Sequence, residues 1–333
     1  MIKLAINGFG RIGRAAFKIA RERDDIEVVA VNDLGDVENL AYLLRYDSVY
    51  GRYGRSVEVA PGELRVDGQA VRVFAEKDPT QLPWKNLGID VVIESTGIFT
   101  EEEGARQHIT AGARKVIISA PTKSEAVPTI VRGINEEALA GKELISNASC
   151  TTNCAAPMVA VLDNAFGIEK AILTTAHAYT ASQSLVDGPA KKDYRGGRAA
   201  AYNMVPASTG AAVAATQAYS ALAGKFDGVS IRVPVPVVSL SDITALLKKE
   251  VSVDDVNNAF RQAAENPLYK DIMGVTDEPV VSSDFIGDPR SAIIDLLMTR
   301  VVGGNLVKIM AWYDNEWGYS NRLVEQAVAL GSN

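Results

Sequence analysis

The chain has 333 residues, of which 47% are hydrophobic and 23% charged, and its formal net charge is −7. This length suits two domains better than one core, and the composition is that of an ordinary globular protein. The acidic balance argues against nucleic acid or an anionic membrane as the main partner. No apolar run is long enough to span a membrane, and residues 2–7 resemble a first strand rather than a signal peptide. We therefore expect a cytoplasmic protein.

The first half of the chain alternates strand-like and helix-like patterns. Short apolar strands are expected at residues 3–7, 26–31, 91–94 and 115–119, and helices at residues 14–20 and 101–111. Such alternation is typical of parallel strands joined by right-handed crossovers.

The second half has longer predicted strands, at residues 171–175, 228–234, 237–244, 292–295 and 306–313. Helices are expected at residues 155–165, 209–222, 253–265 and 320–330. The segment 178–204 is rich in Gly, Pro, Ser and charged residues, and loops of this length are usually functional or lie at interfaces. We place the domain break at Asn147 to Cys150.

A glycine pattern follows the first predicted strand. Gly8, Gly10 and Gly13 give G-x-G-x-x-G, and Asp33 ends the second strand 20 residues beyond Gly13. The glycines allow a pyrophosphate to approach the start of a helix, and the acid can bind the ribose hydroxyls. The other interpretation is a glycine turn without a ligand. A carboxylate at position 33 would repel a 2′-phosphate, so the pattern favours NAD over NADP.

Cys150 stands where a strand gives way to a helix. It is flanked by the hydroxyls of Ser149, Thr151 and Thr152 rather than by aliphatic side chains. Unpaired N–H groups and the helix dipole favour a thiolate at such a position. Cysteines are more often buried structural thiols, and that interpretation suits Cys154 better. Two cysteines at this spacing do not form a disulfide framework, and we expect no metal site.

The chain has only two histidines that could serve Cys150 as a base. His177 comes just after an apolar strand, where an imidazole can draw a proton from the thiol and hold an ion pair with it. The alternative for His177 is a core histidine held by hydrogen bonds. His108 lies in a polar helical stretch and is expected to be a solvated surface residue.

Three segments are candidates for binding anions. Ser208-Thr209-Gly210-Ala211 begins a helix with hydroxyls and a glycine, which suits an anion. Arg232 lies inside an apolar strand, where a guanidinium is expected either to bind a phosphate or to form a structural salt bridge. Residues 191–198 resemble a basic nucleic-acid motif, but in an acidic chain we interpret them as a loop contact.

Several motifs, in this order along the chain, resemble those of phosphorylating glyceraldehyde-3-phosphate dehydrogenases. They are Asn7-Gly-Phe-Gly-Arg-Ile-Gly-Arg14, Glu94-Ser-Thr-Gly97, Ser119-Ala-Pro121, Ser149-Cys-Thr-Thr-Asn153, Asp187-Gly-Pro189, Ser208-Thr-Gly-Ala-Ala212, Arg232-Val-Pro234 and Trp312-Tyr-Asp-Asn-Glu-Trp-Gly-Tyr-Ser320. The resemblance implies an α/β protein with a Rossmann-type parallel-sheet domain at residues 1–149. It also implies an α+β catalytic domain with a mostly antiparallel sheet at residues 150–315, and a C-terminal helix, 316–333, that packs back on the first domain.

The resemblance also implies an activity and the residues that carry it. The expected enzyme is an NAD-dependent homotetramer that converts glyceraldehyde 3-phosphate and inorganic phosphate into 1,3-bisphosphoglycerate, with Cys150 as nucleophile and His177 as base. The residues implied to contact NAD are Gly8, Gly10, Arg11, Ile12, Gly13, Asp33, Lys77, Ser119 and Asn315. Those implied to hold phosphate groups are Ser149, Thr151, Thr180, Arg198, Thr209, Gly210 and Arg232.

Two alternatives remain open at this stage. A related enzyme acting on erythrose 4-phosphate would use the same residues. A thiol redox sensor on a nucleotide-binding scaffold is conceivable because Cys150 and Cys154 are one helical turn apart.

Overall fold

The structure is a computed structural model and describes residues 1–190 and 193–333. These residues form two compact units. Unit 1 comprises Met1–Ile130, Glu136–Ala148 and Ser320–Asn333, and unit 2 comprises Val131–Asn135 and Ser149–Tyr319. Each unit is built around its own eight-stranded sheet.

The sheet of unit 1 has the order β10-β9-β8-β1-β2-β7-β6-β5. The strands from β10 to β7 are parallel, and β7, β6 and β5 form an antiparallel edge. The strand bounds are β1 (Ile2–Asn7), β2 (Ile26–Asn32), β5 (Val57–Ala60), β6 (Glu63–Val66), β7 (Gln69–Phe74), β8 (Val91–Glu94), β9 (Lys115–Ile118) and β10 (Leu144–Ser146). A separate two-stranded ribbon pairs β3 (Tyr46–Asp47) with β4 (Gly51–Arg52).

The order of the strands places a topological switch at β1. The chain runs from β1 to β2 on one side and later returns to β8 on the other, so the carboxyl ends of β1 and β8 are adjacent. Ligands of open parallel sheets bind at such a point. The central strands are buried apolar runs, as expected for a sheet covered on both faces.

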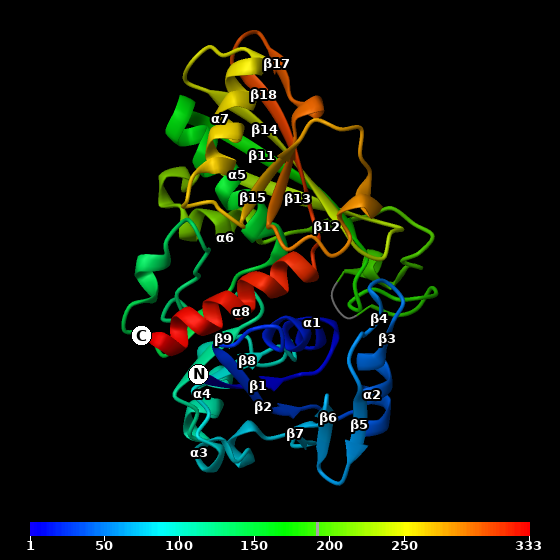
Figure 1. Cartoon of the computed structure of the whole chain (residues 1–333). Helices are drawn as coiled ribbons and strands as arrows, with labels where there is room; N and C mark the ends of the chain where they lie inside the picture. The colour runs from blue at the N-terminus through cyan, green and yellow to red at the C-terminus, as the bar shows by residue number, and fades with distance from the viewer. Residues whose placement is uncertain (191–192) are drawn as a thin grey trace. The chain divides into compact units, whose positions relative to one another are not determined.

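The helices of unit 1 connect these strands, and the last helix of the chain joins them (Figure 1). Lys115 Nζ donates to Leu330 O at 2.7 Å, and Leu323 and Leu330 are fully buried. The helix bounds are α1 (Arg11–Ala20), α2 (Val37–Arg45), α3 (Trp84–Leu87), α4 (Glu102–Thr110) and α8 (Trp317–Ser332).

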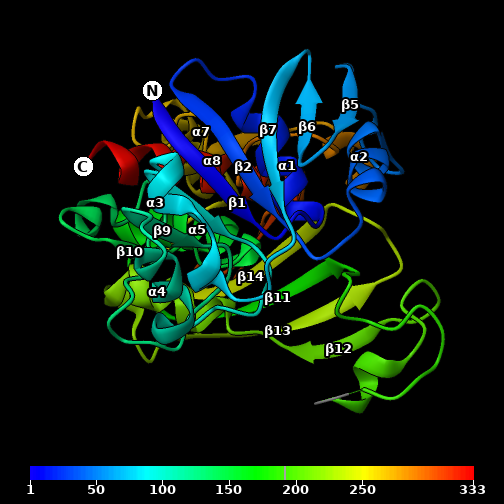
Figure 2. The same ribbon diagram turned by 90° about the horizontal axis from the view of Figure 1, so that it is seen from below.

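The sheet of unit 2 has the order β12-β13-β11-β14-β18-β16-β15, and β17 pairs with β18. Figure 2 shows β12, β13, β11 and β14 side by side. Most pairs are antiparallel; β11 with β13 and β15 with β16 are parallel. The bounds are β11 (Ile168–Ala178), β12 (Val205–Ser208), β13 (Phe226–Val233), β14 (Ser239–Leu247), β15 (Met273–Thr276), β16 (Ala292–Asp295), β17 (Arg300–Val302) and β18 (Leu306–Tyr313).

Three helices accompany this sheet: α5 (Cys150–Phe166), α6 (Ala211–Ala218) and α7 (Val253–Glu265). Helix α5 is buried almost throughout and packs against α6, α7 and the strands β14 and β16. Residues of β14 alternate between buried and half-buried, so one face of the sheet is covered within unit 2 and the other is more open.

The parallel sheet of the first half and the mostly antiparallel sheet of the second are confirmed. The helix expected at residues 209–222 is shorter than predicted, because the backbone of Tyr219 leaves the helical region at φ −120° and ψ 81°. Its hydroxyl donates to Asp163 Oδ2 at 3.1 Å, which ties this break to the end of α5. Among the described residues, no helix is long and apolar enough to cross a membrane.

Candidate functional site

Cys150 is the first residue of α5, and as a residue it is half-buried. The preceding residue, Ser149, caps the helix: its Oγ accepts from Thr152 N at 3.0 Å. Ala148 adopts a positive φ of 55°, an uncommon conformation for a residue with a side chain that is often found at functional sites. The local backbone therefore directs Cys150 to the end of α5 where N–H groups lack partners within the helix.

His177 lies beside this thiol. It is the next-to-last residue of β11, only 4% exposed, and its Nε2 is 3.4 Å from Cys150 Sγ. Its Nδ1 is 2.7 Å from the carbonyl oxygen of Ala178. In the tautomer with the proton on Nδ1, that proton is donated to the carbonyl and the lone pair of Nε2 can accept the thiol proton. In the other tautomer, Nδ1 accepts from the guanidinium of Arg232, which can only donate and lies 2.8 Å away.

Arg232 is the third member of this cluster. Parallel pairing of β13 with β11 sets Arg232 opposite His177, and Nη1 lies 2.8 Å from His177 Nδ1 and 3.1 Å from Ala178 O. In the part of the chain that the structure describes, no carboxylate lies within 4.0 Å of this guanidinium. The structural salt bridge considered for Arg232 is therefore absent there, and its charge is available to an anion.

The surroundings shift both pKa values. Burial raises the pKa of the Cys150 thiol, while the charge of Arg232 and a contact with Thr151 oppose that rise. Burial and the charge of Arg232 lower the pKa of His177 to about 4, against the effect of the Ala178 carbonyl. In the ligand-free protein these shifts favour a neutral thiol and a neutral imidazole, so the ion pair expected from the sequence is not the favoured state.

Cys154 does not belong to the reactive cluster. It is fully buried, its Sγ lies 3.8 Å from Met158 Sδ, and burial raises its pKa to about 12. A thiol in this environment is inert, which argues against the redox pairing with Cys150 that its spacing suggests.

A buried tyrosine supports the cluster from β18; it lies in the motif at residues 312–320, but no role was expected for it. Tyr313 Oη lies 2.9 Å from Thr151 Oγ1 and 2.9 Å from Thr175 Oγ1. Its ring centroid is 6.1 Å from that of His177, edge to face. Tyr313 thus joins the first turn of α5 to β11, the two elements that carry Cys150 and His177.

Two of the expected phosphate ligands lie at the start of a second helix. Thr209 Oγ1 accepts from Ala211 N at 3.1 Å, and Gly210 is the exposed residue that precedes α6. Thr152 Oγ1 donates to Ala211 O at 3.3 Å, so the first turns of α5 and α6 are in contact. Two helix N-termini in contact favour an anion through their N–H groups and dipoles.

The other two polar residues expected at the phosphates have partners of their own. Thr180 Oγ1 lies 2.8 Å from Ser182 Oγ, and the Nε of Arg198 donates to Asp187 Oδ2 at 2.9 Å. The Arg198 side chain is 61% exposed. In the basic stretch 191–198, the first two residues lie outside the described part of the chain, and Arg195 is paired with Asp193.

The glycine pattern forms a tight turn between β1 and α1. Gly8 has φ +93°, and a Cβ on Gly13 would lie 2.0 Å from Gly8 O, so neither position admits a side chain. A Cβ on Gly10 would meet nothing within 4 Å, and no side chain caps α1. The turn therefore leaves open space in front of the uncapped N-terminus of α1, which fits a pyrophosphate.

The acid at the end of β2 is held against this turn. Asp33 Oδ2 accepts from Phe9 N at 2.7 Å and Oδ1 accepts from Gly35 N at 2.8 Å. Arg11 and Ile12 are the first two residues of α1, and Arg11 pairs with Asp47 at 3.1 Å. These residues of unit 1 match the requirements of a dinucleotide with free ribose hydroxyls.

Three further residues expected to contact NAD are spread over both units. Lys77 is exposed after β7, and Ser119 follows β9, where its N–H donates to Glu94 O at 2.9 Å. Asn315 belongs to unit 2 and is buried, and its Oδ1 accepts from Ser239 Oγ at 3.0 Å.

The expectation for His108 is wrong. Its side chain is fully buried in α4, where Trp84 Nε1 lies 3.1 Å from Nδ1 and Glu94 Oε2 lies 3.0 Å from Nε2. Most residues around it are polar and face solvent, but Ala105 and His108, at positions i and i+3, lie on the buried face of the helix. No group of three or more His, Cys, Asp or Glu side chains in residues 1–190 and 193–333 is arranged to hold a metal ion.

Known proteins resemble the chain over nearly its whole length. Residues 2–102 match the family model of the glyceraldehyde 3-phosphate dehydrogenase NAD binding domain, and residues 149–315 match that of the C-terminal domain. A glyceraldehyde-3-phosphate dehydrogenase of Haemophilus influenzae is 49% identical over 328 residues, 97% of this chain and 96% of that protein. Glyceraldehyde-3-phosphate dehydrogenase 2 of Streptomyces avermitilis is 51% identical over 334 residues, 99% of each chain. A glyceraldehyde-3-phosphate dehydrogenase of Priestia megaterium is 51% identical over 328 residues, 98% of this chain and 97% of that protein. The chain belongs to the glyceraldehyde-3-phosphate dehydrogenase family.

Proposed function

We propose that the protein converts glyceraldehyde 3-phosphate and inorganic phosphate into 1,3-bisphosphoglycerate with NAD, using Cys150 as nucleophile and His177 as base. The observation that carries this proposal is the 3.4 Å distance between Cys150 Sγ and His177 Nε2 at the start of α5. A thiol within reach of an imidazole, at a helix N-terminus, is the arrangement that nucleophilic catalysis requires.

The first step joins the thiol to the aldehyde. Sγ bonds to the carbonyl carbon, the thiol proton moves to His177 Nε2, and the carbonyl oxygen takes up that proton to give a hemithioacetal on Cys150. The N–H groups at the start of α5 stabilise the negative charge that develops on this oxygen. Because burial disfavours the charged forms of both groups, His177 acts here as a general base rather than as a preformed counter-ion.

The second step converts the hemithioacetal into a thioester. NAD, when bound, supplies the acceptor for the hydride that leaves the carbon. His177 removes the hydroxyl proton, and the carbon–oxygen double bond forms again with the sulfur still attached. The residues proposed to hold NAD are Gly8, Gly10, Arg11, Ile12, Gly13, Asp33, Lys77, Ser119 and Asn315.

The third step releases the acid as an acyl phosphate. Inorganic phosphate attacks the thioester carbon, the carbon–sulfur bond breaks, and Cys150 recovers its proton from His177. The charge of Arg232 and the paired N-termini of α5 and α6 support an anion in this cluster. The residues proposed to bind phosphate groups are Ser149, Thr151, Thr180, Arg198, Thr209, Gly210 and Arg232.

We also propose that the protein is a cytoplasmic homotetramer that binds neither nucleic acid nor membranes. The open face of the unit 2 sheet supports self-association, because it exposes Ile172 by 54%, Val229 by 48% and Leu306 by 42%. A shallow apolar hollow of about 320 Å³ lies on this face. Its lining comprises Lys170, Ala171, Ile172, Thr244, Leu246 and Leu306. A second copy of the chain would cover these side chains.

The functional division of the chain is likewise a proposal. We assign residues 1–149 to dinucleotide binding and residues 150–315 to catalysis, with the helix at residues 316–333 belonging to the first part. The inclusion of Ser320–Asn333 in unit 1 supports this assignment, as does the start of α5 at Cys150.

The decisive experiment follows NADH absorbance with glyceraldehyde 3-phosphate, with NAD or NADP and with phosphate present or omitted. We expect turnover that requires phosphate and prefers NAD. The Cys150→Ser variant should lose turnover and retain NAD binding, whereas Cys154→Ser, the matched control, should keep its activity. Substantial phosphate-dependent NADH formation by Cys150→Ser would refute the assignment of the nucleophile. If erythrose 4-phosphate is turned over faster than glyceraldehyde 3-phosphate, it replaces glyceraldehyde 3-phosphate as the proposed substrate.

A further inference from the structure

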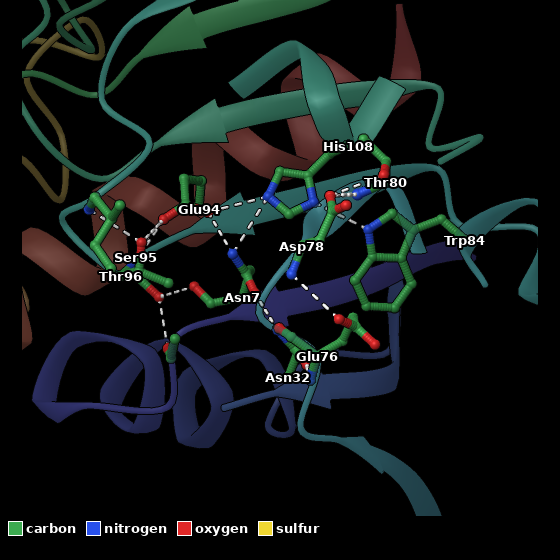
Figure 3. A network of polar contacts seen from close by, with 12 residues as sticks. Asn7, Asn32, Glu76, Asp78, Thr80, Trp84, Glu94, Ser95, Thr96 and His108 are labelled. Atoms are coloured by element: carbon green, nitrogen blue, oxygen red, sulfur yellow. Dashed lines mark hydrogen bonds and ion pairs between the residues drawn. The ribbon is translucent and has the colours of Figure 1, made fainter. Parts of the chain in front are cut away.

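A buried polar network in unit 1 adjoins the glycine turn, and no step of the proposed reaction uses it. Figure 3 shows that it joins Glu94 at the end of β8, Asn7 at the end of β1, His108 of α4 and Trp84 of α3. None of these four side chains is more than 2% exposed. Buried polar groups at the carboxyl ends of two adjacent parallel strands are well placed to shape a ligand site.

The network fixes the tautomer of His108. The indole N–H of Trp84 can only donate, and its Nε1 lies 3.1 Å from His108 Nδ1. Nδ1 therefore accepts and carries no proton. A neutral imidazole has one N–H, which must then be on Nε2, where it donates to Glu94 Oε2 at 3.0 Å. His108 is thus a neutral donor to Glu94.

Glu94 receives donors on both oxygens. Oε2 accepts from Asn7 Nδ2 at 2.6 Å as well as from His108, and Oε1 accepts from the N–H of Thr96 at 2.8 Å and from its hydroxyl at 2.5 Å. Three N–H groups and one hydroxyl are directed at it, so both oxygens serve as acceptors. An amide in its place would direct its NH₂ against two of these donors.

This carboxylate links the strand ends to the glycine turn. Its partner Asn7 immediately precedes Gly8, and its partner Thr96 is so close to Gly8 that a Cβ there would lie 2.6 Å from Thr96 N. Ser95 Oγ donates to Gly8 O at 2.7 Å. The segment after β8 therefore packs directly against the turn, and there is no room between them for a side chain at position 8.

We propose that Glu94 is a positioning residue for the dinucleotide turn, and that Trp84 keeps His108 in the tautomer that orients Glu94. The inference rests on the proposed role of residues 8–13 in NAD binding. Glu94 acts through Asn7, Ser95 and Thr96, which set the distance between the two strand ends where the pyrophosphate is expected.

The tautomer can be measured without any variant in the network. The chain contains only two histidines, so a protein labelled with nitrogen-15 in histidine gives two pairs of ring signals, assigned with His177→Gln. At pH 7.5 we expect His108 to show a proton on Nε2 and none on Nδ1. A proton on Nδ1 would overturn the inference.

The positioning role is tested by a double-mutant cycle with the NAD dissociation constant as readout. Glu94→Gln should raise this constant at least tenfold and leave kcat at saturating NAD unchanged within about twofold, whereas Trp84→Phe should change the constant less than threefold. In the double variant His108 can shift its proton to Nδ1 and accept from the new amide. We therefore expect NAD binding at least threefold tighter than in Glu94→Gln alone. A purely structural role predicts that the double variant binds no better, and that result overturns the inference.

A milder pair of variants covers the case in which Glu94→Gln does not fold. Ser95→Ala removes the hydroxyl that holds Gly8, and Ser124→Ala removes a hydroxyl bonded to Glu101 in the same unit. We expect at least threefold weaker NAD binding for the first and no change for the second. Equal binding by both variants counts against the inference and leaves the proposed reaction intact. If the wild-type protein does not bind NAD, the cofactor assignment itself fails.

Discussion

At the scale of single residues, Arg232 has the largest influence on the charges of the reactive pair. Burial raises the pKa of Cys150 and lowers that of His177. The guanidinium of Arg232, with Nη1 only 2.8 Å from the imidazole, opposes the first shift and adds to the second. One cation therefore favours the thiolate and opposes the imidazolium. An anion bound to Arg232 would weaken both effects at once.

The first prediction concerns the reactivity of this thiol. In Arg232→Gln the pKa of Cys150 should be higher than in the wild type, because the charge that offsets the effect of burial is lost. Alkylation by iodoacetamide, followed as a function of pH, should show a midpoint displaced to higher pH. Arg198→Gln is the matched control, since that arginine pairs with Asp187. A midpoint that stays in place or falls would contradict the role given to Arg232.

The second prediction links His177 to stability. Its folded pKa of about 4 lies below the ordinary value of 6.5, so the native state favours the neutral ring. The neutral ring therefore contributes to the free energy of unfolding. This contribution is complete above pH 6.5, is lost as the pH falls towards 4, and amounts to about 3 kcal/mol. In urea unfolding experiments without ligand, the free energy of unfolding of the wild-type protein should therefore fall more steeply between pH 6.5 and pH 4 than that of His177→Gln. Parallel curves for the two proteins would show that His177 is not the group responsible.

At the scale of elements, the two glycines of the β1–α1 turn have different roles. Gly13 is needed because there is no room for a side chain, whereas Gly10 is expected to leave space for the cofactor. Gly13→Ala would place a Cβ 2.0 Å from Gly8 O and should destabilise unit 1. At Gly10 a Cβ meets no protein atom, so Gly10→Ala should preserve the melting temperature and weaken NAD binding, because the methyl group occupies the space in front of α1. Calorimetry and NAD titration of both variants measure the two effects. Normal NAD affinity in Gly10→Ala would argue against pyrophosphate binding at this turn.

Elements with strong periodicity were predictable from the sequence, and elements set by tertiary pairing were not. Strand β8 has the predicted bounds, Val91–Glu94, because a buried parallel strand is one uninterrupted apolar run. Strand β11 extends to Ala178, three residues beyond its predicted end at 175, because pairing with β13 continues as far as Ala178. Cys150 and His177 were recognisable as a thiol at a helix start and a histidine after a strand. The buried state of His108 was not, since its partners Glu94 and Trp84 are 14 and 24 residues away.

At the scale of the whole molecule, the open sheet face of unit 2 determines the expected assembly. Ile172→Glu would place a charge among the apolar side chains that a second copy is proposed to cover. Analytical ultracentrifugation should then find a smaller species than the tetramer proposed for the wild type. Val281→Glu, at an equally exposed apolar residue outside the sheet, should leave the mass unchanged. An unaltered tetramer in Ile172→Glu would exclude this face as a subunit contact.

Because most of the final helix, α8, belongs to unit 1, the folding of unit 1 during translation depends on residues that are made late. Ser320–Asn333 belong to the same compact unit as the first strand of the chain, and Leu330 and Leu323 are fully buried there. Domains generally fold as they emerge from the ribosome, the N-terminal one first. In this protein the sheet of unit 1 must wait for residues 320–333 before its core can close. The catalytic half, by contrast, has all its segments already translated.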